Sequence, residues 1–363
     1  MRRPNPYPLL FCSLFALLGQ ASGASGQAPA SPSAAAPPPS VGATSAGSAR
    51  VPARPNPPAA ARNQIRLPIW VEQEEDSLWK DGQARDFQVF LNDKEAPIRS
   101  FHRPDGPSIL LVVLDTIADL ARVEEAKTVL IEGLEKLPEN YWVGLLRAQN
   151  GLSVLQEPTA DRRVVAEKIR AISLGGKAGL LDVLEMVSTM ATEVSKKARV
   201  RIQALYLTDG GIGDYRADYL NPVVNASDSG DLSRRFSDRA VRERMDRQAE
   251  ALQRFTVPTS VVHLNYYSDP LNLAYMSGLE KISGDSGGTS AFCRSQEEIR
   301  PALQKALERY QAGYQVTVDE PARLRQALKV RITWKNPDSA AGRRILFPDT
   351  VVPAQPPRKN QKS

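Results

Sequence analysis

The chain is poor in the side chains that most often carry catalysis, with 2 cysteines and 2 histidines among its 363 residues. Cys12 lies in an N-terminal apolar stretch that we expect to be removed, so Cys293 is left alone and an intrachain disulfide is excluded. With only His102 and His263 present, an enzyme is disfavoured. No run of five or more lysines and arginines occurs, so no nucleic-acid partner is predicted.

Long apolar runs are equally scarce. Apart from residues 9–18, no segment approaches the roughly 18 uninterrupted apolar residues that a spanning helix requires, so no transmembrane segment is predicted. Arg2 and Arg3 precede that run and small residues follow it, which is the pattern of a secretory signal peptide. We therefore predict a signal peptide at residues 1–26 and an exported protein, either periplasmic or secreted. Residues 27–64 are rich in alanine, proline and serine, and are predicted to form a disordered tether.

The rest of the sequence divides into three parts that differ in their pattern of apolar and polar residues. Residues 65–104 contain short alternating runs with a turn at 92–95, which predicts a small β-module. Over residues 105–335 strand and helix patterns alternate, which predicts a doubly wound α/β domain with a mainly parallel sheet and helices on both faces. The predicted strands are 108–114, 141–147, 152–155, 202–207, 259–264, 289–292, 314–318 and 328–334, and the predicted helices are 123–137, 162–172, 180–197, 232–255, 273–283 and 296–312. Residues 336–363 are predicted to be a C-terminal tail.

Two of the predicted strands end in aspartate. The apolar run 108–114 leads into Asp115, and the run 202–207 leads into Thr208 and Asp209. The carboxyl ends of parallel strands lie along one rim of a sheet, and open α/β sheets bind ligands at that rim. We therefore expect the two carboxylates to lie close together there.

Several stretches, taken in order, resemble the von Willebrand factor type A (VWA) domain, and more narrowly the VWA-related domain family of secreted acidobacterial proteins. The matching stretches are 86–94 with 98–101, Leu110-Leu-Val-Val-Leu-Asp115-Thr116, Leu207-Thr-Asp-Gly210, the glycine-rich segment 283–292, and Tyr310-Gln-Ala-Gly-Tyr314. The resemblance covers about residues 67–334. It implies a VWA fold that binds a partner protein through the loops at the C-terminal rim.

The resemblance also implies a metal site, because VWA domains present Asp-x-Ser-x-Ser on one loop, a threonine on a second and an aspartate on a third. Asp115 and Asp209 match the two aspartates. Ile117 and Asp119 replace the serines, and Ala178 stands where the threonine should be. The site is therefore expected to be degenerate.

The residues at these positions allow two arrangements of the carboxylates. Mg²⁺ or another divalent cation held by Asp115, Asp119 and Asp209 would be largely neutralised, and would attract an acidic partner group weakly. Alternatively, the carboxylates bond to backbone amides and solvent. In that case Lys177, which reaches the threonine position with a one-residue shift, could act as the countercharge if it points inward.

The sequence thus predicts an exported, non-enzymatic protein-interaction domain of VWA type with a degenerate metal site. The alternatives are a metal-independent envelope scaffold and an enzyme of unknown class. The predicted contact loops are 115–120, 175–180 and 209–219. The residues expected on the partner-binding rim are Asp115, Thr116, Asp119, Lys177, Thr208, Asp209 and Asp214.

Overall fold

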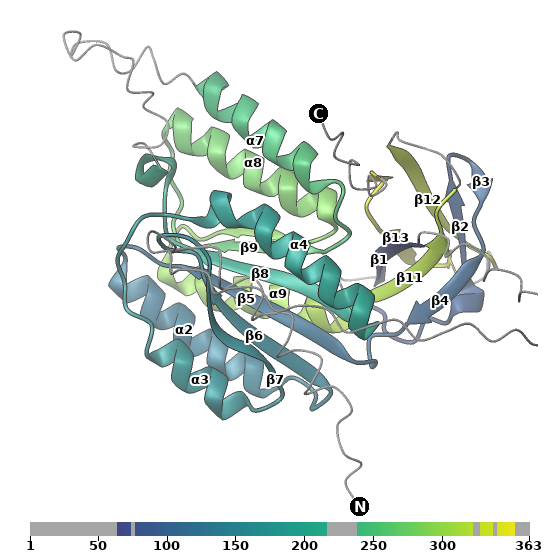
Figure 1. Cartoon of the computed structure of the whole chain (residues 1–363), viewed down its shortest axis with the longest axis horizontal. Helices are drawn as coiled ribbons and strands as arrows, with labels where there is room; N and C mark the ends of the chain where they lie inside the picture. Colours follow the sequence, from purple (N-terminus) through teal and green to yellow (C-terminus); the bar gives the residue numbers. More distant parts are fainter. Residues whose placement is uncertain (1–63, 74–76, 216–237, 322–326, 337–339, 353–363) are drawn as a thin grey trace, which may run out of the picture.

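The computed structural model describes residues 64–73, 77–215, 238–321, 327–336 and 340–352, and a six-stranded sheet forms its centre (Figure 1). The strand order is β10-β9-β8-β5-β6-β7, and all neighbours are parallel except β7, which is antiparallel to β6. The strands are β5 (Ser108–Asp115), β6 (Tyr141–Arg147), β7 (Ser153–Thr159), β8 (Arg201–Thr208), β9 (Thr259–His263) and β10 (Ser290–Phe292). The predicted signal peptide and nearly all of the predicted tether lie outside the described residues.

Helices cover both faces of this sheet, which confirms the doubly wound α/β prediction (Figure 1). One face carries α2 (Leu120–Glu135), α3 (Arg162–Arg170) and α9 (Ile299–Ala312), and the other carries α4 (Leu180–Ala198), α7 (Asp238–Leu252) and α8 (Pro270–Ser286). Side chains alternate along a strand. In β5, Ile109 and Leu111 accordingly pack with α4 while Leu110 and Val112 pack with α2, so both sets must be apolar.

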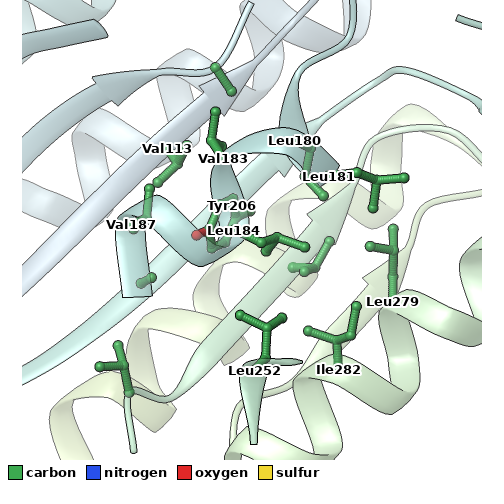
Figure 2. Packing of buried hydrophobic residues seen from close by; sticks show 14 of the residues in the cluster. Val113, Leu180, Leu181, Val183, Leu184, Val187, Tyr206, Leu252, Leu279 and Ile282 are labelled. Carbon is green, nitrogen blue, oxygen red and sulfur yellow. The ribbon is translucent and has the colours of Figure 1, made fainter. Parts of the chain in front are cut away.

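The core on the α4 face shows why the helices form where they do. Leu184 of α4 lies beside Tyr206 of β8, and Leu181 of α4 points to the side where Leu279 of α8 lies (Figure 2). All of these side chains are buried. Each such side chain contributes about 1.5–3 kcal/mol by leaving water, so the packed faces fix the loops that connect helices to strands.

The β-module differs from the prediction because both ends of the described chain build it. One of its sheets has the order β13-β1-β11-β4 and the other has the order β14-β12-β2-β3. The strands from the front are β1 (Gln64–Gln73), β2 (Phe87–Leu91), β3 (Lys94–Glu95) and β4 (Ile98–His102). Those from the back are β11 (Tyr314–Asp319), β12 (Leu328–Trp334), β13 (Arg343–Leu346) and β14 (Thr350–Val351). The two sheets share one apolar core.

This pairing corrects three predicted boundaries. The module is not confined to 65–104, the α/β domain does not include the strands after residue 313, and 336–363 is not only a tail, because β13 and β14 lie inside it. The physical reason is visible in β12, where buried and exposed residues alternate over its first five positions. Such a strand covers a core with one face only, whereas β5 and β8 are buried throughout.

The β-module lies at the N-terminal ends of the parallel strands, away from the C-terminal rim (Figure 1). Buried Arg201, the first residue of β8, marks this junction by donating to the carbonyl oxygens of Gly313 and Pro104. The module therefore occupies one end of the sheet and leaves the opposite rim to the loops that follow β5, β6, β8 and β9.

Candidate functional site

Asp115 ends β5, and its side chain is completely enclosed, with 0% of its surface exposed. Its Oδ1 accepts a hydrogen bond from the Gly179 amide at 3.0 Å, and its Oδ2 accepts one from the Leu180 amide at 3.2 Å. The hydroxyls of Thr208 and Tyr215 each lie 3.3 Å from Oδ2. The carboxylate therefore ties the end of β5 to the N-terminus of α4 and to the end of β8.

The electrostatics of Asp115 are set by its enclosure. Burial raises the pKa of Asp115 from 3.8 to about 6, and the charge of Asp209 adds to the rise. The amides of Gly179 and Leu180 and the hydroxyl of Thr208 oppose it by stabilising the anion. Gly179 is the N-cap of α4, and a helix N-terminus favours a negative charge. Asp115 is thus a helix-capping group that burial keeps easy to protonate.

Asp209 follows β8 and holds the loop after β5 in place. Its Oδ1 accepts from the Ile117 amide at 2.6 Å, and its Oδ2 accepts from the amides of Ala118 and Asp119 at 2.8 and 2.7 Å. Only 3% of its surface is exposed. Three converging backbone amides form an anion-binding nest, and here the anion is a side chain of the protein itself. The Asp209 amide also lies 3.4 Å from the Asp115 carbonyl oxygen, so the two aspartates are brought together as predicted.

Asp119 has a different task, because both of its carboxylate oxygens are engaged by Arg122. Oδ1 accepts from the Arg122 amide at 3.1 Å as the N-cap of α2, and Oδ2 lies 3.4 Å from the Arg122 Nε. The Arg122 guanidinium also donates to the carbonyl oxygens of Leu264, Cys293 and Arg294. This arginine therefore ties the start of α2 to the ends of β9 and β10.

The centre of the three loops is apolar. A Cβ atom placed on Gly210 would lie 2.8 Å from Ile117 Cδ1 and 3.4 Å from Ala178 Cβ. Ala178 is buried, and Ile117 packs against the same core cluster. In the resembled family these two positions carry oxygen ligands, and here they carry hydrocarbon.

These residues do not fit a divalent cation. Magnesium and calcium require several oxygen ligands that are free to coordinate. Every carboxylate oxygen of Asp115, Asp209 and Asp119 already accepts a hydrogen bond or forms an ion pair within the protein. No group of three histidine, cysteine, aspartate or glutamate side chains in the described part of the chain could hold a metal ion. In the described residues Asp115, Asp119 and Asp209 therefore do not form the three-carboxylate cluster considered from the sequence.

The structure also corrects the predicted contact set, since four of its seven residues are buried. Asp115, Thr116, Thr208 and Asp209 have between 0 and 3% of their surface exposed. A partner cannot touch them while the loops keep this arrangement. They stabilise the rim loops from within the fold, and the Asp115 and Asp209 carboxylates do so by accepting hydrogen bonds from loop amides.

The other three members of the predicted set remain accessible. Lys177 is exposed; its amide donates to Asn150 Oδ1 at 3.0 Å, and its side chain is not among the groups bonded to Asp115 or Asp209. It is therefore not the inward countercharge. Asp214, in the short helix η3 (Ile212–Tyr215), is also exposed, and it accepts from the Gly211 amide at 2.7 Å. Asp119 is partly exposed. The rest of the predicted loop, 216–219, lies outside the described residues.

Sequence reasoning missed a second layer of polar side chains under the rim. Gln149 donates to the carbonyl and hydroxyl oxygens of Thr116. Asn265 and Tyr267 both donate to the Asp209 carbonyl oxygen at 3.1 Å. All three donors follow the ends of β6 and β9, as Asp115 follows β5. The strand-end rule that selected the two aspartates would also have found these residues.

His263 belongs to the same layer and has a fixed tautomer. Its Nδ1 accepts from the Asn265 amide at 3.2 Å, so Nε2 carries the proton and donates to the Gly210 carbonyl oxygen at 2.9 Å. Burial lowers the pKa of His263, which keeps the ring neutral. The imidazole is thus a structural brace between the ends of β8 and β9, with both ring nitrogens occupied.

Three exposed apolar side chains belong to segments that follow the strands at the C-terminal rim. Among the described residues, five large hydrophobic side chains are exposed, and three of them lie on the β5–α2 and β9–α8 connections. They are Leu120 in the first turn of α2, Tyr266 before α8 and Leu273 in the first turn of α8, exposed by 61%, 38% and 39%. The Arg122 contacts described above tie these connections to each other. Exposed apolar side chains at one rim make that rim a candidate interaction surface.

Two patterns that imitate catalytic motifs have structural explanations. Ser286, in the sequence Gly284-Asp-Ser-Gly-Gly288, lies at the end of α8, where its hydroxyl donates to the Ser283 carbonyl oxygen and accepts from the Thr259 amide. Cys293 is buried, and burial raises the pKa of its thiol to about 11. Neither group is arranged as an activated nucleophile.

Comparison with known proteins gives likenesses at the level of structure only. No protein-family model matches the chain, and no curated protein matches it. A von Willebrand factor type A protein from Catenulispora acidiphila aligns with a TM-score of 0.43 and 12% identity, over 76% of each chain. A mutant of the PilB minor pilin from Streptococcus sanguinis aligns with a TM-score of 0.43 and 14% identity, over 60% of this chain and 64% of the pilin. The SpRpn10 VWA domain aligns with a TM-score of 0.35 and 10% identity, over 55% of this chain and 94% of that domain.

Scores this low add nothing to the description of the fold, which depends on strand order and on which helices cover which face. Within the described residues, no helix combines the length and the apolar character needed to cross a membrane.

Proposed function

We propose that the chain carries an exported, non-enzymatic protein-interaction domain of VWA type, which binds a partner protein through its C-terminal rim without a metal ion. The ordered sequence resemblance over residues 67–334 supports the VWA assignment. The doubly wound sheet, whose rim is left open by the β-module, supports the location of the binding surface. The pattern of residues 1–26 supports export to a bacterial envelope or beyond.

The observation that carries this proposal is the exposure of Leu120, Tyr266 and Leu273 in segments that follow strands β5 and β9 at the rim. Burying one such side chain against a partner yields about 1.5–3 kcal/mol, which is the scale of an interface hot spot. The loops beneath are braced by the Asp115 and Asp209 carboxylates, so the apolar side chains are presented on a preorganised platform. Preorganisation lowers the entropic cost of binding.

The proposed mode of binding is metal-independent, because the described residues offer no group of three metal-ligating side chains. A cation at a VWA rim recruits an acidic side chain of the partner. Here Ile117 and Ala178 fill the centre, and the carboxylates are satisfied by amides. The partner would therefore be held by apolar contact and by rim charges such as Asp119, Lys177 and Asp214, and chelation would leave its affinity unchanged.

The positions of the two histidines and of Cys293 argue against an enzyme. His263 is a buried brace, and His102 lies in β4 at the opposite end of the sheet from the rim. Cys293 is buried with a raised thiol pKa. A general base and a nucleophile must lie within hydrogen-bonding reach of each other. His263 and Cys293 lie at the ends of neighbouring strands, but the thiol packs in the core on the α2 face, and both ring nitrogens of His263 are occupied by Gly210 and Asn265.

Affinity capture with paired variants tests the proposal. The chain without residues 1–26 would be immobilised and exposed to the envelope fraction of the producing cell, and bound proteins would be identified by mass spectrometry. The rim variant carries Leu120→Asp and Leu273→Asp. The matched control is Met186→Asp, because Met186 is also an exposed apolar residue (47%) but lies in the middle of α4.

We expect a partner that the unaltered protein and the Met186→Asp control capture and that the rim variant loses. Capture that survives in the rim variant would favour the alternative of a scaffold that binds through its helices or its N-terminal segment. Export is tested separately by N-terminal sequencing of secreted or periplasmic protein, which should begin after about residue 26. Recovery of protein that begins at Met1 would contradict export by a cleaved signal.

A further inference from the structure

The edge of the central sheet at β10 forms a second candidate binding surface, which shares Tyr266 with the apolar rim group. β10 is the last strand of the six-stranded sheet and, within the described residues, pairs only with β9. All three of its residues are partly exposed, whereas every residue of the inner strands β5, β8 and β9 is buried. Its outer side is therefore an accessible strand edge.

The direction of the backbone groups along β10 follows from its pairing. The Thr289 carbonyl oxygen accepts from the Val261 amide at 2.8 Å, and the Cys293 amide donates to the His263 carbonyl oxygen at 2.9 Å. Backbone groups alternate in direction along a strand. The amide and carbonyl groups of Ser290 and Phe292 therefore point away from β9, and they are the groups that an added strand would bond.

A groove with two walls runs along this edge. A hollow beside β10 is lined by Glu280 of α8 and by Glu298 of the short helix η4 (Gln296–Glu298), in addition to the strand itself. Helix α8 packs on one face of the sheet, and α9, which continues from η4, packs on the other. One carboxylate thus stands on each side of the strand edge, and β10 forms the floor.

The charge of the groove selects the kind of peptide that fits. Both glutamates are exposed, and the one cation in the lining, Arg294, has its guanidinium 4.7 Å from the centre of the Tyr266 ring. The lining is therefore net negative. Successive side chains of an added strand point to opposite faces of the sheet, so two adjacent basic residues would reach Glu280 and Glu298 respectively.

We propose that β10 accepts an extended segment of a partner protein by strand addition, and that this segment carries two adjacent lysine or arginine residues. Main-chain hydrogen bonds to Ser290 and Phe292 would supply affinity, and the two glutamates would supply selectivity. The proposal can be tested independently of binding at the rim, since Tyr266 is the only member of the rim group that lines the groove and neither Leu120 nor Leu273 does.

A fluorescence-anisotropy titration of the full chain tests this directly. The probe is a short blocked peptide of alternating valine and threonine with a central lysine–arginine pair. The matched peptide has two glutamates at the centre. Three protein variants are compared with the unaltered chain: Ser290→Pro, which removes the outward amide without touching the bonds to β9, Glu280→Lys, and the control Glu308→Lys on an exposed site of α9.

We expect saturable binding of the basic peptide, weakened about tenfold or more by Ser290→Pro and by Glu280→Lys and unchanged by Glu308→Lys. The acidic peptide should not bind. If Ser290→Pro lowers the melting temperature, its loss of binding could reflect unfolding. The proposal is then tested by the effect of Glu280→Lys on basic-peptide binding and by the difference between the two peptides. Equal binding of both peptides, insensitivity to Glu280→Lys, or no saturable binding would overturn the proposal.

Two further measurements distinguish strand addition at β10 from dimerisation through the same edge and from peptide binding at the rim. If the chain dimerises and Ser290→Pro makes it monomeric, the edge takes a second copy of the chain and the peptide proposal fails. Peptide binding should persist in the rim variant carrying Leu120→Asp and Leu273→Asp. Its loss in that variant would place the peptide on the rim and refute the β10 site.

Discussion

Replacing Asp209 with alanine distinguishes a structural anion from the remnant of a metal site. The substitution leaves the amides of Ile117, Ala118 and Asp119 without their acceptor. A hydrogen bond to a charged group contributes about 1.5–3 kcal/mol, but water can refill part of this half-buried loop. We therefore expect the free energy of unfolding to fall by about 3–5 kcal/mol.

A metal-site remnant would behave in the opposite way. Three carboxylates kept together for a missing cation repel each other, so removing one of them should raise stability. The sign of the change therefore separates the two readings, independently of its exact size.

Urea denaturation followed by circular dichroism, in chelator at pH 7, measures this quantity. Asp119→Ala is the matched control, because it removes one capping bond of α2 and should cost only about 1 kcal/mol. Asp209→Asn should fall between the two, since an amide offers one acceptor oxygen. A loss below about 1 kcal/mol for Asp209→Ala, or any gain, would refute the claim that this carboxylate holds the first loop.

Three further outcomes follow from the same site. Folding raises the pKa of Asp115 from 3.8 to about 6, so its contribution to stability is fully present below pH 4 and is lost as the pH rises through 6. The difference in unfolding free energy between the unaltered chain and Asp115→Asn should therefore fall by about 3 kcal/mol from pH 4 to pH 8; a pH-independent difference contradicts this. Thermal melts with millimolar Mg²⁺ and with chelator should coincide, because a site filled at a hundred times its Kd would add about 2.7 kcal/mol; a rise in Tm abolished by Asp115→Ala would show a working site. Gly179→Ala should destabilise the fold by about 3 kcal/mol in urea titrations, since its Cβ would lie 1.8 Å from the Ala148 carbonyl oxygen; an unchanged midpoint would refute that packing.

The positions of Asp115 and Asp209 could be predicted from the sequence because the reasons are local. Each follows an unbroken apolar run, and such runs form the inner strands of a covered parallel sheet. The register Asp115↔Thr208 then brings the two strand ends together. The replacement of oxygen ligands by Ile117 and Ala178 was equally local information.

The bonding partners and the burial of those carboxylates could not be predicted in the same way. Whether an aspartate on a strand end faces water, a cation or backbone amides depends on loops that are distant in sequence. Asp115 meets Gly179 and Leu180, 64 and 65 positions away, and Asp209 meets Ile117, 92 positions away. The expectation that both would touch a partner failed because these contacts bury them. Pairing between the front and back strands of the β-module is non-local for the same reason.

The construction of the β-module from both ends sets the order in which a growing or translocating chain can fold. The α/β part is complete once α9 has emerged. Among the described strands, β1 and β4 have no strand partners until residues 314–351 arrive, and β2 pairs only with the two-residue strand β3. Pairing of such distant strands is slow, and unpaired edges meanwhile invite aggregation or proteolysis. A chain cut before β12 would keep a folded α/β unit with a defective β-module attached. Completion of the module therefore depends on the last described strands, and a truncated molecule would expose unpaired strand edges that a protease could attack.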